Sequence, residues 1–181
     1  MNGGIEPSRR GQTPSEPVSG PPGAALSILL LFGFLAFVFV FAATAGFVTS
    51  NNVDGWYETI RKPALTPANW VFPVVWNFLY FLMGLSGWLI WRSAGSFPAA
   101  GAPLAIFAAQ VMLNFTWSVI FFGMHSTAGA AIEIFALLAA ILATIFAFWR
   151  INRLAAALLF PYLAWVLFAT YLSLAVWLLN R

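Results

Sequence analysis

Long apolar stretches without charge dominate the chain and are separated by shorter polar segments. Each stretch has about 20 residues or more, the length a helix needs to cross the hydrocarbon layer of a bilayer. Backbone polar groups in lipid must be satisfied within their own segment, so such stretches predict helices. We therefore expect five membrane-spanning helices, at about residues 26–49, 72–91, 103–124, 128–149 and 154–179.

The first 25 residues have a different composition from the rest of the chain. They are rich in Pro, Gly and Ser and hold almost no large apolar side chain, so they cannot offset the entropy cost of ordering. We expect residues 1–25 to be a disordered tail and residues 26–181 to form one transmembrane domain. The first apolar run is longer than the roughly 7–15 residues of a signal-peptide core, so we expect it to be retained as a span.

Most connections between the expected spans are short. Residues 93–102, 125–127 and 150–153 are tight links, which favours antiparallel neighbours in a compact bundle. The segment at 50–71 is longer and contains aromatic residues, charged residues and two prolines. A long loop of this composition is a candidate lid over a cavity opening.

The distribution of basic residues indicates an orientation. Five basic residues fall on the side of the N-terminus and three on the other side, and the excess favours a cytoplasmic N-terminus. The first group is Arg9, Arg10, Arg92, Arg150 and Arg153, and the second is Arg61, Lys62 and Arg181.

Composition excludes several classes of protein. With 62% hydrophobic and 7% charged residues, the chain is far from the roughly one quarter charged residues of a soluble domain. We expect an integral multi-pass protein whose main surroundings are the lipid bilayer. Cysteine is absent and the net charge is only +3, so neither thiol chemistry nor nucleic-acid binding is expected. The lone His125 and the lone Lys62 fall outside the spans, so we expect no buried metal cluster and no intramembrane Schiff base.

Polar and aromatic residues recur at helical spacing within three of the spans. Such spacing places side chains on one face of a helix. The faces either line a common ligand pocket or hydrogen-bond and pack between helices, and the spacing alone leaves both interpretations open. The residues are Gln110, Asn114 and Trp117 on the third span, Trp76, Tyr80, Gly84, Gly87 and Trp91 on the second, and Pro161, Tyr162, Trp165 and Ala169 on the fifth.

Two further features have a structural and a functional interpretation. Glu133 is the one acid within a span, and it is either a structural acid near a helix end or a group that binds a proton or a ligand. Ala105 and Ala109 have the spacing of a small-residue helix contact, as do Ala42 and Gly46. The pair on the third span is our first choice for a dimer face.

Three ordered motifs resemble the TspO/MBR family of tryptophan-rich sensory and translocator proteins. The loop and second span carry Trp56-Tyr57, Lys62-Pro63, Pro67-x-x-Trp70, Phe72-Pro73, Trp76, Leu79-Tyr80 and Met83-Gly84. The third span carries Gln110-x-x-x-Asn114-x-x-Trp117 followed by Phe121-Phe122-Gly123, and the fifth carries Pro161-Tyr162-Leu163-Ala164-Trp165. The resemblance covers residues 26–179.

The resemblance implies an all-α five-helix transmembrane bundle, often a homodimer. It implies a protein that binds a tetrapyrrole such as protoporphyrin IX or haem and acts as a sensor or transporter rather than an enzyme, with no obligatory cofactor and no catalytic or metal site. A porphyrin-degrading membrane enzyme and a sterol-binding or lipid-binding scaffold remain as alternatives. The ligand-binding residues it implies are Trp56, Tyr57, Phe72, Trp76, Tyr80, Asn114, Trp117, Trp165 and Ala169.

The chain departs from the family pattern near the C-terminus. Leu174 and Leu178 stand where many members have a tyrosine and a basic residue. A proposed sterol motif needs both polar groups, so we expect sterol binding to be weak relative to porphyrin binding.

Overall fold

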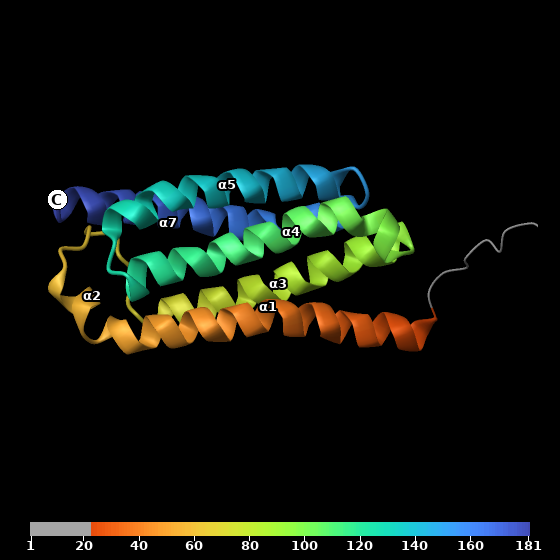
Figure 1. Ribbon diagram of the computed structural model, residues 1–181, viewed down its shortest axis with the longest axis horizontal. Helices are drawn as coiled ribbons and strands as arrows, with labels where there is room; N and C mark the ends of the chain where they lie inside the picture. Colours follow the sequence, from red (N-terminus) through yellow and green to blue (C-terminus); the bar gives the residue numbers. More distant parts are fainter. Residues whose placement is uncertain (1–22) are drawn as a thin grey trace, which may run out of the picture.

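The chain folds as a bundle of long antiparallel helices (Figure 1). The computed structural model describes residues 23–181, so most of the expected disordered tail lies outside the described residues. Within these residues, five helical segments are long and apolar enough to cross a membrane, which confirms the predicted fold class. These segments make the chain an integral multi-pass membrane protein surrounded by lipid.

The helices extend beyond most of the expected spans. Both α1 and α3 are longer at each end than the uncharged runs, and α1 includes the last two residues of the expected tail. The bounds are α1 Ala24–Val53, α2 Trp56–Thr59, α3 Val71–Ala94, α4 Phe97–Ser118, the π-helical η1 Val119–Gly123, α5 Thr127–Trp149, α6 Arg153–Ala157 and α7 Phe160–Leu179.

The third span begins six residues earlier than expected, at Phe97 instead of residue 103. Ser96 caps α4 by accepting a hydrogen bond from the Ala99 amide at 3.3 Å, a favourable arrangement at a helix start. Pro103 therefore lies inside the helix. The link to α3 is reduced to Gly95 and Ser96, and Gly95 adopts a left-handed φ of 78° that glycine accommodates without steric cost.

The fifth span consists of two helices, which the uncharged run at 154–179 does not reveal. Asn152 caps α6, accepting from the Ala155 amide at 3.0 Å, and Pro161 lies in the first turn of α7, where its missing N–H has no cost. The Ser86 hydroxyl on α3 donates to the Ala155 carbonyl at 2.7 Å. This bond ties the short helix to the second span.

Small residues allow the helices to approach closely. A Cβ atom added at Gly84 would lie 2.7 Å from Leu35 Cδ2, and one at Gly87 would lie 3.0 Å from Phe34 Cδ1. These glycines on α3 thus accommodate α1, and α5 packs between α4 and α7. The buried core inside the bundle includes Met83, Ile90, Phe107, Ile141, Phe148 and Tyr162.

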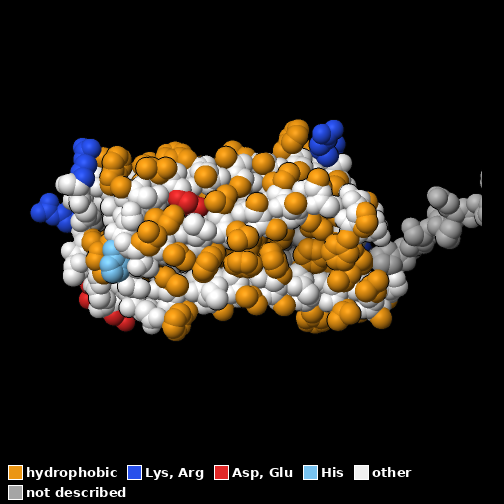
Figure 2. Space-filling view, in the orientation of Figure 1, with side chains coloured by type: hydrophobic (Ala, Val, Ile, Leu, Met, Phe, Trp, Pro, Cys, Tyr) orange, Lys and Arg blue, Asp and Glu red, His pale blue; other side chains and the backbone are white. Residues whose placement is uncertain are grey.

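The outer surface matches a bilayer environment. Figure 2 shows hydrophobic side chains along the length of the bundle and basic side chains towards its two ends. Arginines lie over tryptophan rings near these ends, with Arg92 5.2 Å from Trp88 and Arg153 5.8 Å from Trp149. Such pairs are typical of membrane interfaces.

Candidate ligand cavity and family membership

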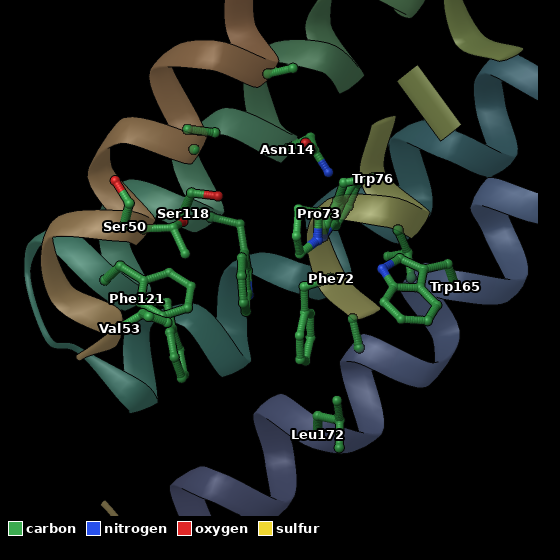
Figure 3. Close-up of a pocket in the computed structure, with 18 of the residues that line it drawn as sticks. Ser50, Val53, Phe72, Pro73, Trp76, Asn114, Ser118, Phe121, Trp165 and Leu172 are labelled. Carbon is green, nitrogen blue, oxygen red and sulfur yellow. The ribbon is translucent and has the colours of Figure 1, made fainter. Parts of the chain in front are cut away.

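A cavity of about 520 Å³ lies in the half of the bundle nearest the loop between α1 and α3. Its walls come from α1, α3, α4 with η1, α5 and α7, while Tyr57, Thr66 and Asn69 reach it from the loop. Figure 3 shows the side chains of Phe72, Trp165 and Phe121, which line the cavity from three of these elements. All five spans and the loop thus enclose one space that no single helix forms.

Aromatic rings form most of the wall opposite α1. The Phe72 and Trp165 rings meet edge to face at 6.0 Å and 73°, which joins α3 to α7. The Trp117 and Phe121 rings stack at 5.0 Å and 10° on the α4 side. Ring pairs in such geometries stabilise one another, so the walls of the cavity are held in place by contacts among the rings themselves.

One buried hydrogen bond supplies the polar part of the wall. The Tyr80 hydroxyl on α3 donates to Asn114 Oδ1 on α4 at 2.5 Å, and both residues line the cavity. Gln110, one turn before Asn114, does not line the cavity and is only 1% exposed. The polar face predicted on the third span is therefore divided: Asn114 and Trp117 line the cavity, while Gln110 lies behind it.

The structure brings together all but one of the residues expected at the ligand site. Trp56 is the exception, because it is absent from the cavity wall. Trp56 and Tyr57 are successive residues of the short α2 and point about 100° apart, and of the two only Tyr57 lines the cavity. The residues that do line the cavity are Tyr57, Phe72, Trp76, Tyr80, Asn114, Trp117, Trp165 and Ala169.

Trp56 instead secures the loop from outside the cavity. Its ring stacks on His125 at 4.5 Å and 15° and meets Phe121 edge to face at 5.5 Å. His125 Nε2 lies 2.9 Å from Asn52 Oδ1 at the end of α1. The lone histidine thus connects the α4–α5 link to the loop, which sequence reasoning did not anticipate.

The first span contributes a wall of small residues that the sequence reasoning missed. Ala42 and Gly46 were interpreted as a helix contact, yet both line the cavity. Small side chains leave the space that the aromatic rings opposite enclose. The signal was present as a run of small and hydroxyl residues. Between Phe39 and Val53, which also line the cavity, the α1 wall holds Ala42, Ala43, Ala45, Gly46, Thr49 and Ser50.

The loop lies over the mouth of the cavity and is fixed to the last helix. The Arg61 amide donates to Asn180 Oδ1 and Asn180 Nδ2 donates to the Arg61 carbonyl, both at 2.9 Å. Lys62 Nζ lies 4.3 Å from the centre of the Tyr57 ring. Burial raises the pKa of the Tyr57 phenol above its usual range, so Tyr57 stays neutral, and the charged residues of the loop are Asp54, Glu58, Arg61 and Lys62.

The side chains of the cavity wall present aromatic faces, amides and hydroxyl groups. No Asp, Glu, His or Cys is among its lining residues, and within residues 23–181 no three such side chains gather as a metal site. The cavity is therefore suited to hold a large, flat, apolar ligand by stacking, with a few hydrogen bonds to fix its orientation.

Comparison with known proteins agrees with this architecture. Residues 34–178 match the model of the TspO/MBR family. The chain is 36% identical over 155 residues to the Tryptophan-rich protein TspO of Archaeoglobus fulgidus, covering 86% of this chain and 99% of that protein. It is 39% identical over 145 residues to the Translocator protein of Homo sapiens, covering 77% and 86%, and 37% identical over 146 residues to Protein CrtK of Rhodobacter capsulatus, covering 80% and 91%. The chain therefore belongs to the TspO/MBR family.

Proposed function

We propose that this protein binds a planar tetrapyrrole, protoporphyrin IX or haem, in the cavity and acts as a membrane sensor or transport protein rather than an enzyme. The observation that carries the proposal is the cavity itself, an apolar space of about 520 Å³ whose walls hold Phe72, Trp76, Trp117 and Trp165. This volume falls within the roughly 300–1,000 Å³ of small-molecule sites. Relatives named "Translocator protein" and "Tryptophan-rich sensory protein" support a function in binding or transport.

The chemistry of a porphyrin complements the wall and the mouth. Its broad π surface offers two faces on which Trp76 and Trp165 can stack. Its peripheral carboxylates then point towards the loop, where Arg61 and Lys62 supply the positive charges that such groups attract. Stacking holds the ring without a ligating side chain, so free-base and metallated porphyrins are both expected to bind.

The proposed orientation places the mouth of the cavity on a definite side of the membrane. The excess of arginine near the N-terminal end of the bundle favours a cytoplasmic N-terminus. The loop at 54–70 follows the first crossing of the bilayer, so it and the mouth lie on the non-cytoplasmic side. A tetrapyrrole would reach the cavity from that side or laterally from the lipid.

Titration with protoporphyrin IX tests the proposal. We expect saturable quenching of intrinsic tryptophan fluorescence, because Trp76, Trp117 and Trp165 lie in the cavity wall. Trp76→Ala and Trp165→Ala should each weaken binding by about 1 kcal/mol or more, the value of lost ring stacking, which is roughly five-fold in Kd. Trp149→Ala is the matched control, because Trp149 is 45% exposed on the outer surface.

The same titration separates the proposed function from the enzymatic alternative. Identical porphyrin spectra after incubation in light and in the dark support binding alone. A protein-dependent product would favour degradation instead. Unchanged affinity in both tryptophan variants, with their fold retained, would place the ligand outside the cavity.

We also propose a homodimer formed through the outer face of α4. Ala105 and Ala109 are both exposed on that face, where small side chains let two backbones approach closely. Ala109→Phe is expected to shift the detergent-solubilised protein from dimer towards monomer, measured by light scattering. Ala164→Phe, an exposed position on α7, should leave the mass unchanged. An unaltered mass in the Ala109 variant would remove this face from consideration.

A further inference from the structure

The exposure of the lining residues shows on which side the ligand cavity is open. The lining residues of α4, η1, α5 and α7 are all buried or half-buried, whereas exposed lining residues occur on α1, on α3 and in the loop just before α3. The shallower groove between α1 and α4 shares no lining residue with the cavity. The exposed lining residues are Ala43, Gly46, Ser50, Asn69, Pro73 and Asn77.

The antiparallel helices α1 and α3 separate in the half of the bundle that holds the cavity. In the other half they touch, since a Cβ at Gly84 would lie 2.7 Å from Leu35 Cδ2. Seven residues make about two turns and return to the same face of a helix. Asn77 therefore faces the same way as Gly84, and Ala42 faces the same way as Leu35. Helices in continued contact would bury Asn77 against Ala42, yet Asn77 is exposed and both residues line the cavity.

The separation continues towards the loop. One turn beyond Ala42, a Cβ added at the exposed Gly46 would have no atom within 4 Å. One turn before Asn77, Pro73 is exposed as well. Figure 3 shows Ser50 of α1 and Pro73 of α3 on facing sides of the cavity. We call this gap the α1–α3 slot, and its edges are Ala42, Ala43 and Gly46 on α1 and Pro73 and Asn77 on α3.

The slot lies at the depth of the lipid. Asn77 is six residues from the start of α3 and Gly46 is seven residues from the end of α1, which is about 9–11 Å inside each helix at 1.5 Å per residue. Large apolar side chains are exposed on the same stretches of the two helices, as expected for surfaces that face hydrocarbon. They are Val40 at 62%, Phe47 at 69%, Val74 at 61% and Phe78 at 56% exposure.

The loop end of the cavity is held closed by direct bonds. Asn180 pairs with both the amide and the carbonyl of Arg61 at 2.9 Å, and its Nδ2 also donates to the Val176 carbonyl at 2.7 Å. Tyr57 lines the cavity from the loop and is only 7% exposed. Entry at this end requires these contacts to break, whereas the edges of the slot are already exposed.

We propose that the α1–α3 slot is the entrance of the cavity, through which a tetrapyrrole dissolved in the bilayer enters and leaves sideways. The proposal rests on the proposed function, because it assigns the route by which the same ligand reaches the same site. Small side chains on α1 leave room for the edge of a flat ring. On α3, Asn77 Nδ2 donates to the Pro73 carbonyl at 2.8 Å, which holds the amide against its own helix.

The test bridges each end of the cavity in turn and uses the absence of cysteine from the chain. Ala43→Cys with Asn77→Cys, the slot pair, places one thiol on each edge of the slot. Ile60→Cys with Asn180→Cys, the loop pair, joins the loop to the end of α7. A flexible bifunctional thiol reagent with a cleavable disulfide bridges either pair. The probe is protoporphyrin IX dimethyl ester, an uncharged porphyrin that partitions into lipid, and tryptophan fluorescence follows its uptake and release in lipid nanodiscs.

A closed entrance should slow exchange without abolishing binding. Bridging the slot pair should slow both uptake and release at least about ten-fold, which is a rise of about 1.4 kcal/mol in the barrier. Both rates fall together because the same barrier is crossed in each direction, so Kd should change far less than the rates. Cleaving the bridge should restore both rates. Bridging the loop pair should leave both rates as they are in the unbridged protein.

A second measurement tests the slot without any ligand. A spin label at Asn77→Cys should collide with dissolved oxygen, which concentrates in lipid, about as often as a label at Val74→Cys on the exposed outer surface of the same helix. Close contact between α1 and α3 at this level would shield the label at Asn77 and make its collisions much rarer.

Each outcome decides a separate part of the account. Unchanged rates after bridging the slot pair, or slower rates after bridging the loop pair, would overturn the slot as the entrance and leave the proposed function intact. Absence of saturable ester binding to the wild-type protein would contradict the proposed function and the entrance together. Rare oxygen collisions at Asn77→Cys would overturn the open slot whatever the porphyrin does.

Discussion

Replacing Ala169 by phenylalanine is expected to abolish high-affinity protoporphyrin IX binding while leaving the bundle folded. Ala169 lines the cavity from α7, and a benzyl group there occupies space that the porphyrin ring needs. Forcing extra atoms into a filled site typically costs about 1–3 kcal/mol, which is roughly a five- to 150-fold rise in Kd. Fluorescence titration in the dark measures this loss.

A matched control separates cavity filling from general damage to α7. Ala164 belongs to the same helix and is exposed on its outer face, so Ala164→Phe should bind protoporphyrin IX with wild-type affinity. Both variants should have the helical circular dichroism of the wild type. Wild-type affinity in the Ala169 variant would mean that the porphyrin does not use this cavity.

The second large effect is expected on stability, at the closest approach of two helices. A Cβ at Gly84 would lie 2.7 Å from Leu35 Cδ2 and 3.1 Å from Leu35 Cα. The second contact is with backbone, so α1 itself must shift. Gly84→Val should therefore lower the free energy of unfolding by about 1–3 kcal/mol, measured as a fall in the thermal midpoint in detergent.

Gly33 provides the comparison for this prediction. A Cβ at Gly33 on α1 would have no neighbouring atom within 4 Å, so Gly33→Val changes helix propensity by the same amount without the clash. Its midpoint should stay at or slightly above that of the wild type. Equal midpoints in the two variants would show that α1 and α3 adapt freely, contrary to the close contact described above.

The five spans could be predicted because each is an apolar run of sufficient length, uncharged except for Glu133 in the fourth, but their ends could not. Proline was used as a boundary at Pro103, although the Ser96 cap starts α4 earlier. Pro161 was expected on the face of a single helix at 154–179, and it instead lies in the first turn of a second helix, α7. Proline fits the first turn of a helix as readily as a break between helices. The position of the proline relative to a capping residue decides which of these two roles it has.

The candidate site was partly predictable for a similar reason. Aromatic and polar residues at helical spacing, together with the family motifs, indicated Trp76, Asn114 and Trp165, which do line the cavity. The alanines of α1 carry no comparable signal, since small residues serve helix contacts and cavity walls equally well. Trp56 was expected at the site but lies outside the cavity wall. A helix of four residues is too short for the sequence to predict which of its faces points into the bundle.

The position of a bound porphyrin is the most direct test of the account. Crystals of the protein with zinc protoporphyrin IX would locate the metal by its anomalous scattering. The account predicts one strong peak per chain inside the cavity enclosed by α1, α3, α4, α5 and α7, with the porphyrin plane facing Trp76 or Trp165. A peak in the groove between α1 and α4, or at the outer surface of the bundle with the cavity empty, would contradict it.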